Sequence, residues 1–142
     1  MFPQAQKTPG VDAVRLIRAH ATADTPEVIF DLAENTLRIV GECYPENALD
    51  FFGPLLDRLK RHFAKGGVQR FRAQIDIHYV NTMGTKALQN VLACLDAEAA
   101  AGVDVEVVWL HDPEDDALEE LGRYLLEEFK SLRGLISAQA RI

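Results

Sequence analysis

The chain has 142 residues, of which 48% are hydrophobic and 26% are charged. These values are typical of one soluble globular domain and exclude a wholly disordered chain. Fifteen lysines and arginines against 22 aspartates and glutamates give a formal net charge of −7. This surplus of negative charge argues against nucleic acid or an anionic membrane as the main partner.

The two cysteines, Cys43 and Cys94, lie far apart and lack the spacing of metal ligands. We interpret them as reduced thiols in a cytoplasmic protein, and we expect no metal and no cofactor. No apolar run approaches the ~20 residues that a membrane-spanning helix needs. The beginning of the sequence shows no secretion signal, which agrees with a cytoplasmic location.

In chain order, residues 1–24 contain two prolines, a glycine and only a short apolar patch, which indicates a loosely ordered N-terminal arm. The compact domain is expected to cover 25–142. Its first two strands, at about 28–32 and 37–39, flank the turn signal Glu34-Asn35 and are expected to form a hairpin. Two later strands, at about 71–79 and 103–109, alternate apolar with polar residues.

Three segments have apolar residues at helical spacing, at about 46–64, 83–101 and 113–130. Asp112 and Pro113 suit the start of the third helix. The pair Leu135-Ile136 either adds a last short strand or packs against the tail. The order is therefore β-β-α-β-α-β-α, which predicts an α/β fold with a single mixed sheet and helices mainly on one face.

Motifs of catalysis are largely absent. The sequence has no glycine-rich phosphate loop, no nucleophile elbow and no zinc-binding helix signature. Asp76 and His78 share a strand face and could form an acid–base pair, although a solvated strand face explains them more simply. A small-molecule or nucleotide-binding enzyme that uses residues 79–86 is retained as the alternative.

The junction at 79–86 is the most informative segment, because a strand there passes directly into a helix. Asn81 or Thr82 can cap the helix, and Lys86 lies in its first turn. Function often gathers at the carboxyl end of a strand in α/β sheets, and free N–H groups at a helix start favour a phosphate. From the residues alone, Thr82 is either a plain cap in an interaction domain or a regulatory phosphorylation site.

Three segments resemble one known family. They are Thr25-Pro26-Glu27-Val28-Ile29-Phe30-Asp31, Gly41-Glu42-Cys43-Tyr44-Pro45-Glu46-Asn47-Ala48 and Tyr79-Val80-Asn81-Thr82-Met83-Gly84-Thr85-Lys86. The second is similar to a G-E-S-Y-P-E-N-A stretch and the third to a Y-x-N-T-S-S-x-K motif. On these motifs the chain is identified as resembling the SiaC family of bacterial regulatory phosphoproteins, over roughly residues 25–130.

The resemblance implies a small, non-enzymatic switch protein with a fold similar to STAS domains, the fold of anti-sigma factor antagonists. In this family a protein kinase phosphorylates the threonine of the N-T motif, and a PP2C-type phosphatase reverses the modification. The unphosphorylated form binds and activates a diguanylate cyclase, which raises cyclic di-GMP and promotes biofilm formation. The oligomeric state is not implied.

Carried over by position, the phosphoacceptor would be Thr82, with the other phosphosite residues around it and a second motif shaping the partner surface. The phosphosite neighbours are Asn81, Met83, Gly84 and Lys86, and the partner-surface candidates are Tyr44, Pro45, Glu46 and Asn47. Met83-Gly84 departs from the family's Ser-Ser, so Gly84 is expected to loosen the first turn. Thr85 supplies a nearby hydroxyl and is a rival phosphoacceptor.

Overall fold

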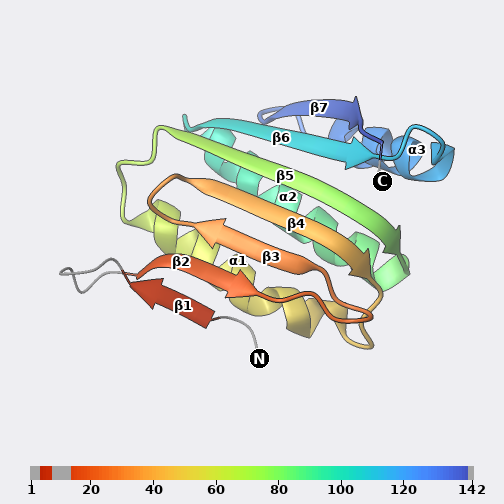
Figure 1. The fold of residues 1–142 in the computed structure, drawn as a ribbon. Coiled ribbons are helices and arrows are strands. Elements are labelled where there is room, and N and C mark those ends of the chain that lie inside the picture. The colour runs from red at the N-terminus through yellow and green to blue at the C-terminus, as the bar shows by residue number, and fades with distance from the viewer. Residues whose placement is uncertain (1–3, 8–13, 141–142) are drawn as a thin grey trace.

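The computed structural model describes residues 4–7 and 14–140 of the chain, and the side chains of 15–140. Within these residues, seven strands form one sheet and three helices pack on it (Figure 1). The strands are β1 (Gln4–Lys7), β2 (Val14–Ala19), β3 (Glu27–Asp31), β4 (Thr36–Cys43), β5 (Arg70–Val80), β6 (Asp104–His111) and β7 (Arg133–Ala138). The helices are α1 (Ala48–Ala64), α2 (Thr82–Ala100) and α3 (Asp116–Glu127).

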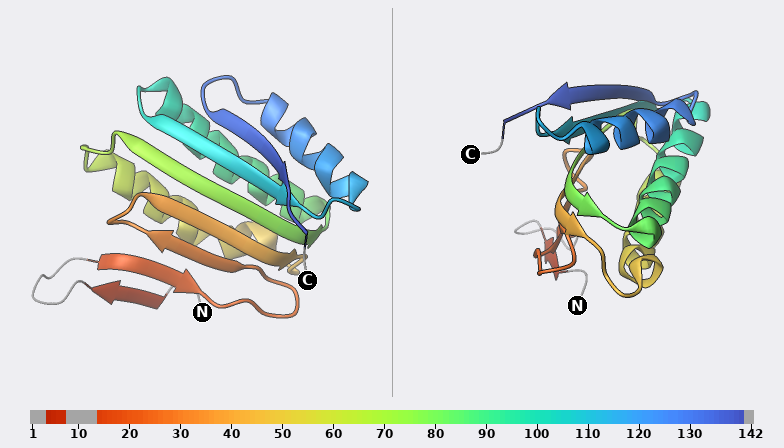
Figure 2. Two further views of the ribbon diagram at one scale, coloured as in Figure 1. Left: turned by 45° about the horizontal axis from the view of Figure 1, so that its top comes forward. Right: turned by 90° about the vertical axis from the view of Figure 1, so that its right-hand side faces the viewer.

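The sheet is mixed, and its strands lie side by side in chain order. Strands β1 to β4 form an antiparallel meander, whereas β4 to β7 are parallel and are connected by α1, α2 and α3. All three helices cover the same face of the sheet (Figure 2). The predicted single mixed sheet with helices on one face is therefore confirmed, and Leu135-Ile136 does belong to a last strand.

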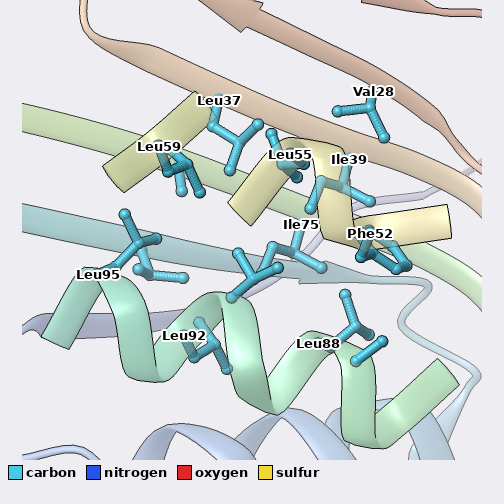
Figure 3. Packing of buried hydrophobic residues seen from close by; sticks show 14 of the residues in the cluster. Val28, Leu37, Ile39, Phe52, Leu55, Leu59, Ile75, Leu88, Leu92 and Leu95 are labelled. Carbon is cyan, nitrogen blue, oxygen red and sulfur yellow. The ribbon is translucent and has the colours of Figure 1, made fainter. Parts of the chain in front are cut away.

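The alternation of buried and exposed residues along the strands explains why the helices pack on only one face of the sheet. In β5, Phe71, Ala73, Ile75 and Ile77 are buried, while the residues between them are exposed or half-buried. The buried side chains meet apolar residues of the helices, such as Phe52, Leu55 and Leu59 of α1 and Leu88, Leu92 and Leu95 of α2 (Figure 3). Burying each large aliphatic side chain contributes about 1.5–3 kcal/mol, so this layer supplies much of the stability.

The N-terminal prediction needs correction. Residues 14–19, placed in a loosely ordered arm, form β2, which pairs with β3 and buries Ile17 completely. Residues 4–7 form β1 beside it, and the rest of the predicted arm up to residue 13 lies outside the described residues. The sheet thus starts before residue 25, and the element order is β-β-β-β-α-β-α-β-α-β.

The start of the third helix also differs from the prediction. Asp115, not Asp112, is the N-cap of α3, and its carboxylate accepts a hydrogen bond from the Leu118 N–H at 3.0 Å. Asp112 instead accepts one from the Glu114 N–H at 2.9 Å and closes a separate turn before the helix. Two capping residues three positions apart compete here, and the helix begins at the one nearer its apolar stripe.

Candidate functional site

The carboxyl ends of β4 and β5 bring the two motif segments together. These strands are parallel neighbours, so Cys43 pairs with Val80 in register. One residue further, the Asn81 N–H donates a hydrogen bond to the Cys43 carbonyl oxygen at 3.2 Å. Residues 41–47 and 79–86, about 35 positions apart in sequence, therefore form one surface at one end of the sheet (Figure 1).

Asn81 begins α2. Its extended backbone and its side-chain oxygen, which accepts from the Gly84 N–H at 2.7 Å, are those of an N-cap. Gly84 is buried, and a Cβ atom there would lie 2.6 Å from the Cys43 carbonyl oxygen. The first turn is thus held closely against β4, in contrast to the looser turn expected from Gly84.

Thr82 is the first residue of α2, and its side chain is exposed. Among the described residues its hydroxyl has no hydrogen-bond partner. The rival hydroxyl of Thr85 is half-buried and donates to the Asn81 carbonyl oxygen at 3.1 Å. Of the two, Thr82 is therefore the hydroxyl that a modifying enzyme reaches without breaking an existing hydrogen bond.

Lys86 lies one turn beyond Thr82, on the same side of α2, because residues four apart in a helix are neighbours. Its side chain is exposed, and within the described chain its ammonium forms no ion pair. The start of α2 also carries no acidic residue in its first turn. A positive helix end and an unpaired lysine together favour negative charge at position 82.

Two aromatic side chains lie at the ends of β4 and β5, close to the start of α2. The rings of Tyr44 and Tyr79 contact each other in a T-shaped arrangement, with centroids 5.4 Å apart. Both rings are well exposed, and so is Met83, which follows Thr82. Tyr44, Tyr79 and Met83 define what we call the apolar rim. Exposed apolar groups gathered at one place are typical of a protein-binding surface.

The remaining residues of the 44–47 motif differ in their exposure and in the contacts that they make. Pro45 is buried, whereas Glu46 is exposed. Asn47 is the N-cap of α1: its side-chain oxygen accepts from the Asp50 N–H at 3.1 Å. The predicted partner-surface set therefore contains three exposed residues, Tyr44, Glu46 and Asn47, of which Asn47 also caps α1, and one buried residue, Pro45.

Cys43, under the apolar rim, is fully buried. Burial raises the pKa of its thiol to about 11, so the thiol stays protonated and unreactive. Both cysteines are free. The side chain of Cys43 serves packing at this site.

The acid–base pair of the enzyme alternative lies outside the junction at 79–86. His78 and Asp76 approach to 3.5 Å on the open face of β5, away from the helices. The surface of the described residues has three hollows of note. One lies near the opposite end of the sheet, one on the open face, and one between α3 and β7. None of these three includes a residue of 79–86. Within the described residues no three side chains are grouped to hold a metal ion, and no helix is long and apolar enough to cross a membrane.

Comparison with known proteins identifies the family. The model of the SiaC family of regulatory phosphoproteins matches residues 19–136, so the chain belongs to that family. A protein from Pseudomonas aeruginosa (strain UCBPP-PA14), itself uncharacterised, is 29% identical over 109 residues, which cover 77% of this chain and 82% of that protein.

Solved structures agree with this assignment. The crystal structure of apo-SiaC from Pseudomonas aeruginosa superposes with a TM-score of 0.80 at 28% identity, covering 87% of this chain and 98% of the other. A second similar chain comes from the crystal structure of the diguanylate cyclase SiaD in complex with its activator SiaC, from the same organism. It superposes with a TM-score of 0.80 at 27% identity, covering 86% of this chain and 98% of the other. The chain is thus similar to an activator of a diguanylate cyclase.

Proposed function

We propose that this protein is a non-enzymatic, phosphorylation-controlled switch of the cytoplasm. In its unphosphorylated form it binds and activates a diguanylate cyclase, and phosphorylation of Thr82 releases that partner. A protein kinase adds the phosphate and a PP2C-type phosphatase removes it. Membership of a family of regulatory phosphoproteins and similarity to a cyclase activator support the partner and the class of regulation.

The observation that carries the choice of Thr82 is its position. Its exposed hydroxyl stands at the start of α2, between the family motif residues and next to the apolar rim. A partner that covers Tyr44, Tyr79 and Met83 therefore also covers Thr82. A group added to this hydroxyl would lie inside the contact and not at its edge.

The energetics are sufficient for a switch. A phosphothreonine carries about −1.5 to −2 charges at neutral pH. Removing this charge from water against an apolar surface costs several kcal/mol unless the partner supplies a counter-charge. Because a penalty of only about 2.7 kcal/mol weakens binding a hundredfold, one phosphate suffices to release the partner.

The same phosphate is tolerated by the free protein. At the start of α2 it meets the positive end of the helix, and Lys86 is one turn away with an unpaired ammonium. Such groups stabilise a nearby dianion by about 0.3–1 kcal/mol each at an exposed position. The modification thus disfavours the complex without unfolding the domain.

The deciding experiment measures cyclase binding and cyclic di-GMP synthesis with the unmodified protein, the kinase-treated protein and the variants Thr82→Ala and Thr82→Asp. We expect the unmodified protein and Thr82→Ala to bind and activate. The kinase-treated protein and Thr82→Asp should bind at least tenfold more weakly. A phosphorylated protein that keeps its partner would overturn the proposal.

Thr85→Ala is the matched control for the modified position. Mass spectrometry after kinase treatment should find one phosphate on the Thr85→Ala protein and none on Thr82→Ala. The opposite pattern would assign the switch to Thr85. Both variants should unfold cooperatively, which shows that a missing phosphate does not reflect a missing fold.

A further inference from the structure

The outer edge of β7 is open. This strand pairs with β6 on one side, and no strand within 4–7 and 14–140 pairs with its other side. Apart from Arg133 it contains no charged residue and no proline, which are two of the features by which natural edge strands avoid pairing. Its Leu135 is 49% exposed on the face of the sheet that the helices leave open. The edge is therefore a ready template for another strand.

We propose that β7 pairs antiparallel with β7 of a second copy of this chain, which joins two sheets into one. The pairing is centred on Leu135, so that Leu135 of each copy lies opposite Leu135 of the other. This proposal is independent of the switch at Thr82, because β7 is the edge strand of the sheet, whereas β4 and β5, whose ends carry the apolar rim, lie in its interior (Figure 1).

The directions of the backbone N–H and C=O groups of β7 agree with a pairing centred on Leu135. The Gln139 N–H, just after β7, donates to the His111 carbonyl oxygen of β6 at 2.8 Å. Since alternate residues of a strand direct their N–H and C=O to the same side, Leu135 also faces β6, whereas Gly134 and Ile136 direct theirs outward. In the proposed register, Gly134 of one copy exchanges hydrogen bonds with Ile136 of the other.

Side chains on the helix-covered face are complementary in the same register. Ile136 of one copy lies opposite Gly134 of the other, where there is no side chain to oppose it. A hollow of about 320 Å³ opens at this place, and its lining includes Leu126, Phe129 and Gly134. The hollow can accept the apolar side chain of the second copy.

The charged residues that line the hollow also complement those of a second copy. Arg123 and Glu127 of α3 both line it, one turn apart. A two-fold axis through Leu135 reverses α3 relative to its symmetry mate and brings Arg123 of each copy, whose guanidinium pairs with Glu119 at 2.8 Å in the free chain, toward Glu127 of the other. Opposite charges thus meet across the axis, which favours a second copy over an unrelated peptide.

The mass of the protein in solution, measured by light scattering over a range of concentrations, tests the proposal. We expect wild type to approach twice the chain mass and Leu135→Lys and Leu135→Glu each to stay monomeric, because like charges then oppose each other at the axis. Mixing these two variants should restore a dimer, which also shows that both are folded. Leu49→Lys, which changes an exposed apolar residue of α1, should dimerise as wild type does.

Cysteine cross-linking tests the register. Residues opposite each other in a non-hydrogen-bonded antiparallel pair have Cα atoms about 4.5 Å apart, within reach of a disulfide. In a Cys94→Ser background, Leu135→Cys should therefore give a disulfide-linked dimer on oxidation. Ser137→Cys, on the same strand face but opposite Arg133 of the other copy, should not.

Three results would overturn the proposal. Wild type could stay monomeric at every concentration, a dimer could form that Leu135→Lys does not disturb, or Ser137→Cys could cross-link while Leu135→Cys does not. A monomer whose β7 amides become protected from hydrogen exchange only when an extended peptide is added would show that the edge takes a peptide strand and not a second copy.

Discussion

Tyr44 and Tyr79 hold the ends of two parallel strands together: their rings meet at an angle of 77°, with centroids 5.4 Å apart, directly after β4 and at the end of β5. Edge-to-face pairs of this kind contribute about 0.5–1.5 kcal/mol beyond their buried area. Since both rings remain partly open to solvent, the pair also presents a preformed aromatic surface beside Thr82.

Tyr79→Ala should weaken binding of the diguanylate cyclase about tenfold or more, because exposed aromatic anchors dominate protein interfaces. Its effect on stability should be small, about 1 kcal/mol, since Tyr79 is 54% exposed. Calorimetric titration and thermal unfolding measure the two effects. Tyr124→Ala, at an equally exposed tyrosine of α3, is the control and should leave cyclase affinity unchanged; an equal loss in both variants would contradict the assignment of the surface.

Gly84→Ala should destabilise the fold by about 1–3 kcal/mol, because the new Cβ would lie 2.6 Å from the Cys43 carbonyl oxygen and 2.8 Å from a methyl carbon of Val80. Urea unfolding measures this loss. Met83→Ala changes the neighbouring position of the same turn, where the side chain is exposed, and should unfold as wild type does. An unchanged midpoint for Gly84→Ala would show that α2 can move away from β4 at no cost.

Gly122→Ala should be destabilising by about 2 kcal/mol, although alanine is the better helix former. Gly122 of α3 packs against the indole of Trp109, so that a Cβ atom would overlap the ring. The indole N–H donates to the Leu118 carbonyl oxygen at 2.9 Å, which fixes the ring in place.

Trp109 is the one tryptophan of the chain, so its fluorescence reports on this contact directly. In a double-mutant cycle, Trp109→Phe should relieve part of the cost of Gly122→Ala because the smaller ring leaves room. Strictly additive losses would mean that the two residues do not interact.

His62 should make stability depend on pH. Its Nε2 lies 2.6 Å from the Asn35 side-chain oxygen, and its ring packs edge-on against Phe30. Burial first, and then the nearby charge of Lys65, lower its pKa from the usual value of 6.5. The native state therefore binds this proton less readily than the unfolded chain, so stability should fall as pH drops below 6.5 and level off below the lowered native pKa.

The comparison that isolates this effect is urea unfolding of wild type and His62→Gln on both sides of that pH. Glutamine keeps a neutral amide near Asn35 and cannot take up the proton. The difference in unfolding free energy between the two proteins should shift in favour of His62→Gln on acidification. A difference that is the same at each pH would contradict the prediction.

The sequence predicted the parts of this fold that depend on regular periodicity. The alternation in Phe71–Ile77 and the leucine spacing of α2 were sufficient, because each pattern buries one face against the other layer. The strand at 14–19 was missed because its apolar residues Leu16 and Ile17 are adjacent, so that no clean alternation shows. Its partner, β3, stabilises it through pairing, and that information is not local.

The candidate site, like the fold, was predictable where it depends on local sequence and not where it depends on the pairing of distant segments. The strand-to-helix junction and the cap at Asn81 were predictable from local chemistry, and the exposure of Thr82 agrees with its predicted role. The contact of Tyr44 with Tyr79 was not predictable, since it depends on the register of β4 and β5. The alternation of β5 placed Tyr79 on its buried side, but the register shift between β4 and β5 after Gly41 lets Val80 pack against the core instead and leaves Tyr79 exposed.

The place of the Thr82 hydroxyl beside the apolar rim has a consequence for the order of events in signalling. Under the function proposed above, an effector that covers the rim would also shield the threonine, so that the kinase would act only on protein that is not engaged. Cyclase bound to the switch would thereby delay its own inactivation, and the rate at which the complex dissociates would set the fastest rate at which the signal is turned off.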